Sequence, residues 1–108
     1  MTTPEAPRKK NSHERVVAFL EARGLADGVM RFEKDATKTA QQAAEQARCE
    51  LGQIIKSLVF VCDETPVLAL VAGDRRGDSD AIAREMGASS CTLADRETVR
   101  SATGYHVG

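Results

Sequence analysis

Two consecutive apolar segments, separated by a short polar turn, constrain the fold of this chain more than any other feature. Residues 54–62 (IIKSLVFVC) and 67–72 (VLALVA) are rich in β-branched and aliphatic side chains, and residues 63–66 (DETP) between them favour a turn. The pattern predicts a β-hairpin at the centre of a sheet. Because a tight hairpin is antiparallel, it excludes a purely parallel, doubly wound sheet and favours a mixed one.

The rest of the chain predicts four helices and two further short strands. Asn11 stands three residues before Glu14, and Thr39 three before Gln42, a spacing typical of a capping box at a helix start. The expected helices are residues 12–23, a helix that follows Thr39, one from Asp78 or Ser79 to Gly87, and one from Asp95 to Gly104. The expected further strands are residues 29–33 and 90–93. The order α-β-α-β-β-α-β-α predicts a mixed α/β (α+β) domain.

Length and charge limit what the chain can bind. Its 108 residues allow one domain, and 15 Lys+Arg against 16 Asp+Glu give a net charge of −1. This balance excludes strong non-specific binding to a phosphate backbone. Residues 1–10, which carry two prolines and a basic cluster, are expected to be a disordered arm that acts as a solubilising tail or a weak RNA contact. Residues 11–108 are then the folded domain.

The apolar segments and the cysteines bear on location and cofactors. No apolar run is long enough for a signal peptide or a membrane-spanning helix, so we expect a soluble, cytoplasmic protein without a membrane partner. Cys49, Cys62 and Cys91 are odd in number and lack CxxC spacing, which argues against a disulfide framework and a zinc site. We expect structural thiols, no metal and no cofactor. The oligomeric state is not predicted.

Lys56 interrupts the first apolar segment and is the strongest candidate for chemistry. A charged group in a central strand is unfavourable unless it is paired or opens into a cavity. Its ammonium carries three donors, which suits a carbonyl or phosphate oxygen at the floor of a pocket. Alternatively, Lys56 extends from the strand end or lies on a solvent-facing side. Weaker candidates are the 73–77 segment (GDRRG), a phosphate-facing loop or a solvated turn, and His106, a general base or a surface residue.

Four segments in order resemble the successive motifs of the YbaK/ProX family of aminoacyl-tRNA deacylases, whose domain also occurs inserted in bacterial prolyl-tRNA synthetases. They are residues 39–45 (TAQQAAE), 52–60 (GQIIKSLVF), 70–76 (LVAGDRR) and 103–108 (TGYHVG). The resemblance runs from the first helix to the last residue. It implies a mixed, mostly antiparallel, barrel-like sheet flanked by helices, and hydrolysis of amino acids wrongly esterified to tRNA.

The resemblance also implies roles for individual residues. Lys56 corresponds to the strand lysine most tied to activity, and would position the ester and stabilise charge in a substrate-assisted reaction. Four residues would line the pocket for the aminoacyl ester and terminal adenosine: Phe32, Ser57, Gly104 and Gly108. The chain departs from the family pattern in two places. Arg48 and Cys49 stand where many members end the second helix with glycine, and the sequence stops at Gly108 within a glycine-proline motif, so the C-terminal part of the domain is expected to be missing.

Three functional interpretations follow from these observations. The first is a trans-editing hydrolase with Cys-tRNA(Pro) as the leading substrate and Ala-tRNA(Pro) as the runner-up. The second is a noncatalytic module that binds the acceptor end of aminoacyl-tRNA or prolyl-tRNA synthetase. The third is an unrelated α/β domain in which Lys56 is a surface residue.

Overall fold

The computed structural model describes residues 11–107, and the chain divides into two compact units, residues 1–31 and 32–108. The predicted arm, residues 1–10, and Gly108 lie outside the described residues. In the first unit, α1 (Ser12–Glu21) begins where Asn11 accepts a hydrogen bond from the Glu14 amide at 2.8 Å, as the spacing predicts. The 3-10 turn η1 (Ala26–Gly28) follows.

The prediction of a strand over residues 29–33 is wrong. This segment follows η1 as irregular backbone and is largely exposed. A strand requires a neighbouring strand to satisfy its backbone N–H and C=O groups. Within the described part of the chain this segment has no such neighbour, so its short alternation of side chains does not produce one.

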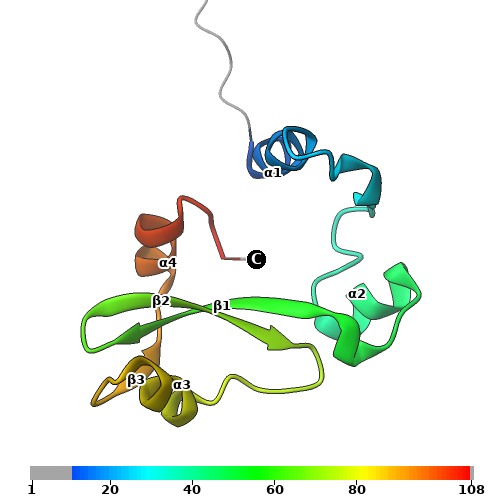
Figure 1. Ribbon diagram of the computed structural model, residues 1–108. Coiled ribbons are helices and arrows are strands. Elements are labelled where there is room, and N and C mark those ends of the chain that lie inside the picture. Colours follow the sequence, from blue (N-terminus) through cyan, green and yellow to red (C-terminus); the bar gives the residue numbers. More distant parts are fainter. Residues whose placement is uncertain (1–10, 108) are drawn as a thin grey trace, which may run out of the picture. The chain divides into compact units, whose positions relative to one another are not determined.

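The second unit contains a three-stranded sheet and three helices. Its elements are α2 (Ala40–Ala47), the 3-10 turn η2 (Leu51–Gln53), β1 (Ile55–Cys62), β2 (Thr65–Ala72), α3 (Ser79–Met86), β3 (Cys91–Leu93) and α4 (Arg96–Thr103). The strand order is β2-β1-β3, and β1 is antiparallel to both neighbours. Figure 1 shows α3 and α4 on opposite sides of this sheet.

The mixed α/β class is therefore confirmed, although every strand pair in the described residues is antiparallel. The connection from β2 through α3 to β3 explains why no parallel pair forms among these strands. β2 and β3 run in the same direction, as strands linked by a helix usually do, but β1 lies between them. As a result, β2 and β3 each pair only with β1, which is antiparallel to both.

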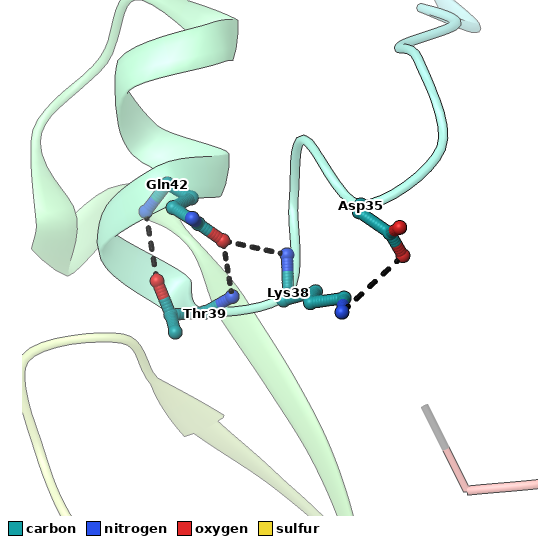
Figure 2. Close-up of polar contacts among 4 residues, drawn as sticks. All are labelled: Asp35, Lys38, Thr39 and Gln42. Atoms are coloured by element: carbon teal, nitrogen blue, oxygen red, sulfur yellow. Dashed lines mark hydrogen bonds and ion pairs between the residues drawn. The ribbon is translucent and has the colours of Figure 1, made fainter.

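Local sequence signals set the ends of α2. Thr39 Oγ1 accepts from the Gln42 amide at 3.1 Å, while Gln42 Oε1 accepts from the amides of Thr39 and Lys38 at 3.2 and 3.0 Å, which confirms the predicted capping box (Figure 2). Lys38 also lies 3.4 Å from the Asp35 carboxylate. At the other end Arg48 adopts a left-handed conformation (φ 56°, ψ 49°), so an arginine serves where glycine is usual.

The predicted ends of α3 and α4 are also confirmed, whereas α1 ends at Glu21, two residues before the predicted end. The N-cap of α3 is Asp78, whose carboxylate accepts from the Ala81 amide at 3.1 Å, and its C-cap is Gly87 with φ 65°. The N-cap of α4 is Asp95 and its C-cap is Gly104 with φ 75°. None of the helices in the described part of the chain is long and apolar enough to cross a membrane.

The hairpin turn is tighter than predicted. It consists of Asp63 and Glu64 alone, both with positive φ (47° and 76°), and Thr65 already pairs with Cys62. Such a two-residue turn matches the twist of the strands it joins. Pro66 therefore belongs to β2, where it is tolerated because β2 is an edge strand.

The small core centres on β1. Its buried side chains are Ala44, Val59, Phe60, Cys62 and Ala83. Successive residues of a strand point to opposite faces, so Val59 faces one side of the sheet and Phe60 the other. Gly77 lies so close to Phe60 that a Cβ on this glycine would be 2.8 Å from the ring. The helix α3, which contacts both β1 and β3, covers the Phe60 side.

The Asp63 carboxylate joins the hairpin turn to the segment before β3. It accepts hydrogen bonds from the amides of Ser89 and Ser90 at 2.7 and 3.0 Å. These two backbone hydrogen bonds hold the pKa of Asp63 below its ordinary value of 3.8. Because the folded-state pKa is lowered, the ionised carboxylate stabilises the fold above pH 3.8, and this contribution is lost as the pH falls through the lower folded-state value.

We predict that Asp63→Asn lowers the melting temperature at pH 7, and that the difference from the unsubstituted chain shrinks as the pH falls below 4. Asparagine tolerates positive φ and retains one acceptor, so the substitution mainly removes the charge. Thermal unfolding followed by circular dichroism between pH 2.5 and 7 measures both effects. Glu64→Gln, in the same turn, is the control and should show neither effect. A pH-independent difference for Asp63→Asn would contradict the assignment.

A second prediction concerns Gly73, whose amide donates to the Ile54 carbonyl at 2.7 Å. A Cβ at this position would collide with the backbone carbonyl oxygen of Leu51. Gly73→Ala should therefore lower the free energy of unfolding by about 1–3 kcal/mol, measured by urea titration. Gly28→Ala is the matched control, because no atom lies within 4 Å of a Cβ at that position. Equal stability of the two variants would show that the Gly73 contact can relax.

Candidate functional site

Lys56 lies on β1 beside Val71 of β2, on the side of the sheet that α3 covers. Its side chain is half-buried, and its Nζ donates a hydrogen bond to the backbone carbonyl of Arg75 at 2.5 Å. The ammonium is therefore held against the loop that joins β2 to α3. A backbone carbonyl thus partly satisfies the charge, a contact that neither sequence interpretation of Lys56 included.

Two glycines bring this loop close to the start of β1. Gly73 lies against the backbone of η2, and a Cβ on Gly52 would lie 2.9 Å from a carboxylate oxygen of Asp74. Side chains at these positions would separate the two segments. The 52–60 and 70–76 motifs, which lie at the open end of the hairpin, thus form one structure around the Lys56 side chain.

The loop provides positive charge beside the Lys56 ammonium. Arg75 and Arg76 are both exposed, and Asp74 is the neighbouring negative charge. An ammonium has three donors, so the hydrogen bond to Arg75 leaves donors for a further oxygen. The arrangement can bind an anionic or carbonyl oxygen and stabilise negative charge that develops there.

Ser57 lies on the other face of the sheet from Lys56, because neighbouring residues of a strand point in opposite directions. It is exposed and pairs with Leu70. Around it is an exposed apolar surface formed by Ile55, Leu68 and Leu70, which are 65%, 58% and 67% exposed. The structure therefore does not bring Ser57 to the Lys56 ammonium.

The other predicted site residues lie on separate elements or outside the described residues. Gly104 ends α4, on the side of the sheet opposite α3 (Figure 1), and its amide donates to the Arg100 carbonyl at 2.9 Å. Phe32 is 38% exposed in the irregular segment that precedes α2. His106, the weaker candidate, is exposed near the C-terminal end. Gly108 lies outside the described residues.

Two shallow depressions have linings that do not include Lys56. The first, of about 440 Å³, lies between Pro66 and α4, and the second, of about 400 Å³, is lined by residues that include Leu58, Phe60 and Gly77. Lys56 lines neither. Among the described residues no three His, Cys, Asp or Glu side chains are grouped to hold a metal ion.

The sequence did not reveal the partner of Lys56, which is a backbone carbonyl. A backbone carbonyl is present in every residue, so the sequence cannot identify it as a partner. The only indication in the sequence that the two motifs approach closely is the pair of glycines at positions 52 and 73. The cross-strand neighbours Cys62 and Cys91 were likewise not linked in advance, because pairing follows from strand register.

Comparison with known proteins places these features in a family. Residues 34–108 match the model of the aminoacyl-tRNA editing domain, a range that includes Lys56, Ser57, Gly104 and Gly108 but not Phe32. The chain is 33% identical over 94 residues to a proline–tRNA ligase of Desulforamulus reducens, covering 82% of this chain and 16% of the ligase. It is 44% identical over 55 residues to a proline–tRNA ligase of Nitratidesulfovibrio vulgaris, covering 51% of this chain and 10% of the ligase.

A solved structure supports the same relationship. The crystal structure of a candidate trans-editing enzyme for prolyl tRNA synthetase superposes with a TM-score of 0.76 at 36% sequence identity, covering 94% of this chain and 64% of that one. The chain thus spans less than two thirds of that structure and a small part of the ligases. The match excludes the interpretation of an unrelated α/β domain. From its matched segment and its fold, this chain belongs to the aminoacyl-tRNA editing domain family.

Proposed function

We propose that the chain is a trans-editing deacylase that hydrolyses the ester bond of mischarged tRNA. Cys-tRNA(Pro) is the leading substrate and Ala-tRNA(Pro) the runner-up, as the resemblance to the YbaK/ProX group implies. The observation that carries the proposal is the Lys56 ammonium, fixed by Arg75 within the matched segment. The reaction consumes water and releases the free amino acid and tRNA with its terminal hydroxyl restored.

Lys56 is proposed to position the ester and stabilise the charge on its carbonyl oxygen. An ammonium that is already oriented needs little rearrangement when that oxygen becomes negative. Its hydrogen bond to a neutral carbonyl, rather than to a carboxylate, leaves its positive charge uncompensated by that partner. In a substrate-assisted reaction the substrate thiol attacks the ester carbonyl and the ribose oxygen leaves with a proton, after which water hydrolyses the cyclic thioester to free cysteine. Where a ribose hydroxyl assists instead, it activates the water that cleaves the ester. Lys56 need not act as a base in either route.

The proposed pocket residues Phe32, Ser57, Gly104 and Gly108 follow from the resemblance alone. Ser57 and its exposed apolar neighbours offer a surface for a base or an aliphatic group on the face opposite Lys56. A role for Ser57 or Gly104 beside Lys56 would require substrate to extend past an edge of the sheet.

The low net charge of the chain supports recognition of tRNA at its acceptor end only. A net charge of −1 gives little long-range attraction to tRNA, so we expect modest, salt-sensitive affinity. We propose that association with prolyl-tRNA synthetase supplements this affinity, and that the protein acts in the cytoplasm, where tRNA is charged.

A noncatalytic module that binds aminoacyl-tRNA or the synthetase is the second candidate. It is favoured by the observation that Lys56 lines neither of the two depressions described above. The two candidates differ in one measurable respect, because only the first releases amino acid from the ester.

We predict that Lys56→Met reduces the first-order rate of deacylation of Cys-tRNA(Pro) by about 10²-fold or more at saturating protein, because methionine keeps the apolar stem and removes the ammonium. Lys56→Ala should do the same. Release of labelled amino acid, corrected for spontaneous hydrolysis, measures the rate, and Ala-tRNA(Pro) and Pro-tRNA(Pro) in parallel assays establish specificity.

Lys38→Ala is the matched control, since it removes one positive charge from an exposed side chain that pairs only locally with Asp35. Its rate should equal that of the unsubstituted chain. An unchanged rate in Lys56→Met would remove the role given to Lys56. Binding of Cys-tRNA(Pro) without any release of amino acid would favour the noncatalytic module.

A further inference from the structure

Cys62 on β1 and Cys91 on β3 lie directly opposite each other in the sheet. Their Sγ atoms are 2.8 Å apart and both thiols are free. Cys62 is buried, whereas Cys91 is partly exposed at the depression beside Leu58 and Phe60. The third cysteine, Cys49, lies just beyond the end of α2. The proposed editing reaction uses none of these thiols.

The hydrogen bonds around this pair define its backbone geometry. The Asp63 amide donates to the Ser90 carbonyl at 3.2 Å, one residue beyond each cysteine. In an antiparallel ladder this pattern makes Cys62 and Cys91 a non-hydrogen-bonded pair, whose Cα atoms are typically about 4.5 Å apart. Disulfides span Cα separations of about 4.4–6.8 Å, so a pair of this type is compatible with the bond.

We propose that Cys62 and Cys91 form a reversible cross-strand disulfide, a modification site for oxidants of the small-molecule disulfide class. The Cys91 thiolate attacks one sulfur of the oxidant, so that a mixed disulfide forms and the first thiol leaves. Cys62 then attacks the Cys91 sulfur, forming the cross-strand bond and releasing the second thiol. The two cysteines lose two electrons and two protons, and the oxidant becomes two thiols.

The environment of Cys91 makes this oxidation slow at neutral pH. Burial, with the hydrogen bond to Cys62 and the charges of Cys62 and Asp63 acting in the same direction, raises the pKa of Cys91 to about 11. The thiolate, which is the attacking species, is therefore scarce at pH 7. The position of the redox equilibrium, rather than the rate, is the appropriate measurement.

The disulfide would link the ends of a long segment. Residues 62–91 contain β2, α3 and the loop that holds Lys56. Closing a loop of this length in the unfolded chain stabilises the folded one. We expect the melting temperature of the oxidised protein to exceed that of the reduced protein by about 10 °C or more.

The test equilibrates the full chain in glutathione buffers with rising ratios of oxidised to reduced glutathione, followed by acid quenching and alkylation of the remaining thiols in denaturant. At the oxidising end, we expect intact mass to show the loss of two hydrogens. Peptide mapping should join the Cys62 and Cys91 peptides and find Cys49 unlinked. Dithiothreitol should restore the original mass and melting temperature.

Cys49→Ser is the control and should leave the cross-link intact, whereas Cys91→Ser should abolish it. The mapping of the unsubstituted chain does not depend on either variant, so poor folding of Cys91→Ser cannot obscure the result. Alkylation of both Cys62 and Cys91 at every ratio, stable glutathione adducts on either, or a cross-link through Cys49 would overturn the proposal. So would a cross-link that leaves the melting temperature unchanged.

Discussion

The pairing of β1 along both of its edges is the constraint on which the rest of the second unit depends. β2 pairs with β1 over its whole length and β3 pairs with its last three residues, which fixes the direction of every β1 side chain. Lys56 consequently faces the α3 side, Ser57 the opposite side, and Cys62 meets Cys91. A shift of register by one residue would exchange the two faces and bury Ser57 in place of Lys56.

The position of the Lys56 ammonium depends on a second constraint, the close approach of two backbone segments. Gly52 and Gly73 allow η2 and the loop after β2 to come together, and Arg75 then presents its carbonyl to the ammonium. A lysine on a strand would otherwise have many rotamers and considerable entropy to lose on binding. Its fixed orientation is consistent with a group that stabilises charge during hydrolysis, as proposed.

Local signals in the sequence predicted local structure well and long-range structure less well. Thr39, Asp78 and Asp95 were correctly expected to begin helices, because a capping side chain bonds an amide only three residues away. The strand expected over residues 29–33 did not form, because pairing depends on a distant segment. Lys56 was identified because it interrupts an apolar pattern, whereas its partner, the Arg75 carbonyl, has no signal in the residue types.

The sequence by itself determined the helix ends, the hairpin, the editing-domain motifs and the choice of Lys56, because each depends on residue type and short spacing. Only the tertiary structure decided that β1 lies between β2 and β3, that Lys56 and Ser57 face opposite sides, and that Cys62 and Cys91 are neighbours. The physical reason is that strand order and register arise from hydrogen bonds between segments far apart in the chain, which composition and periodicity do not specify.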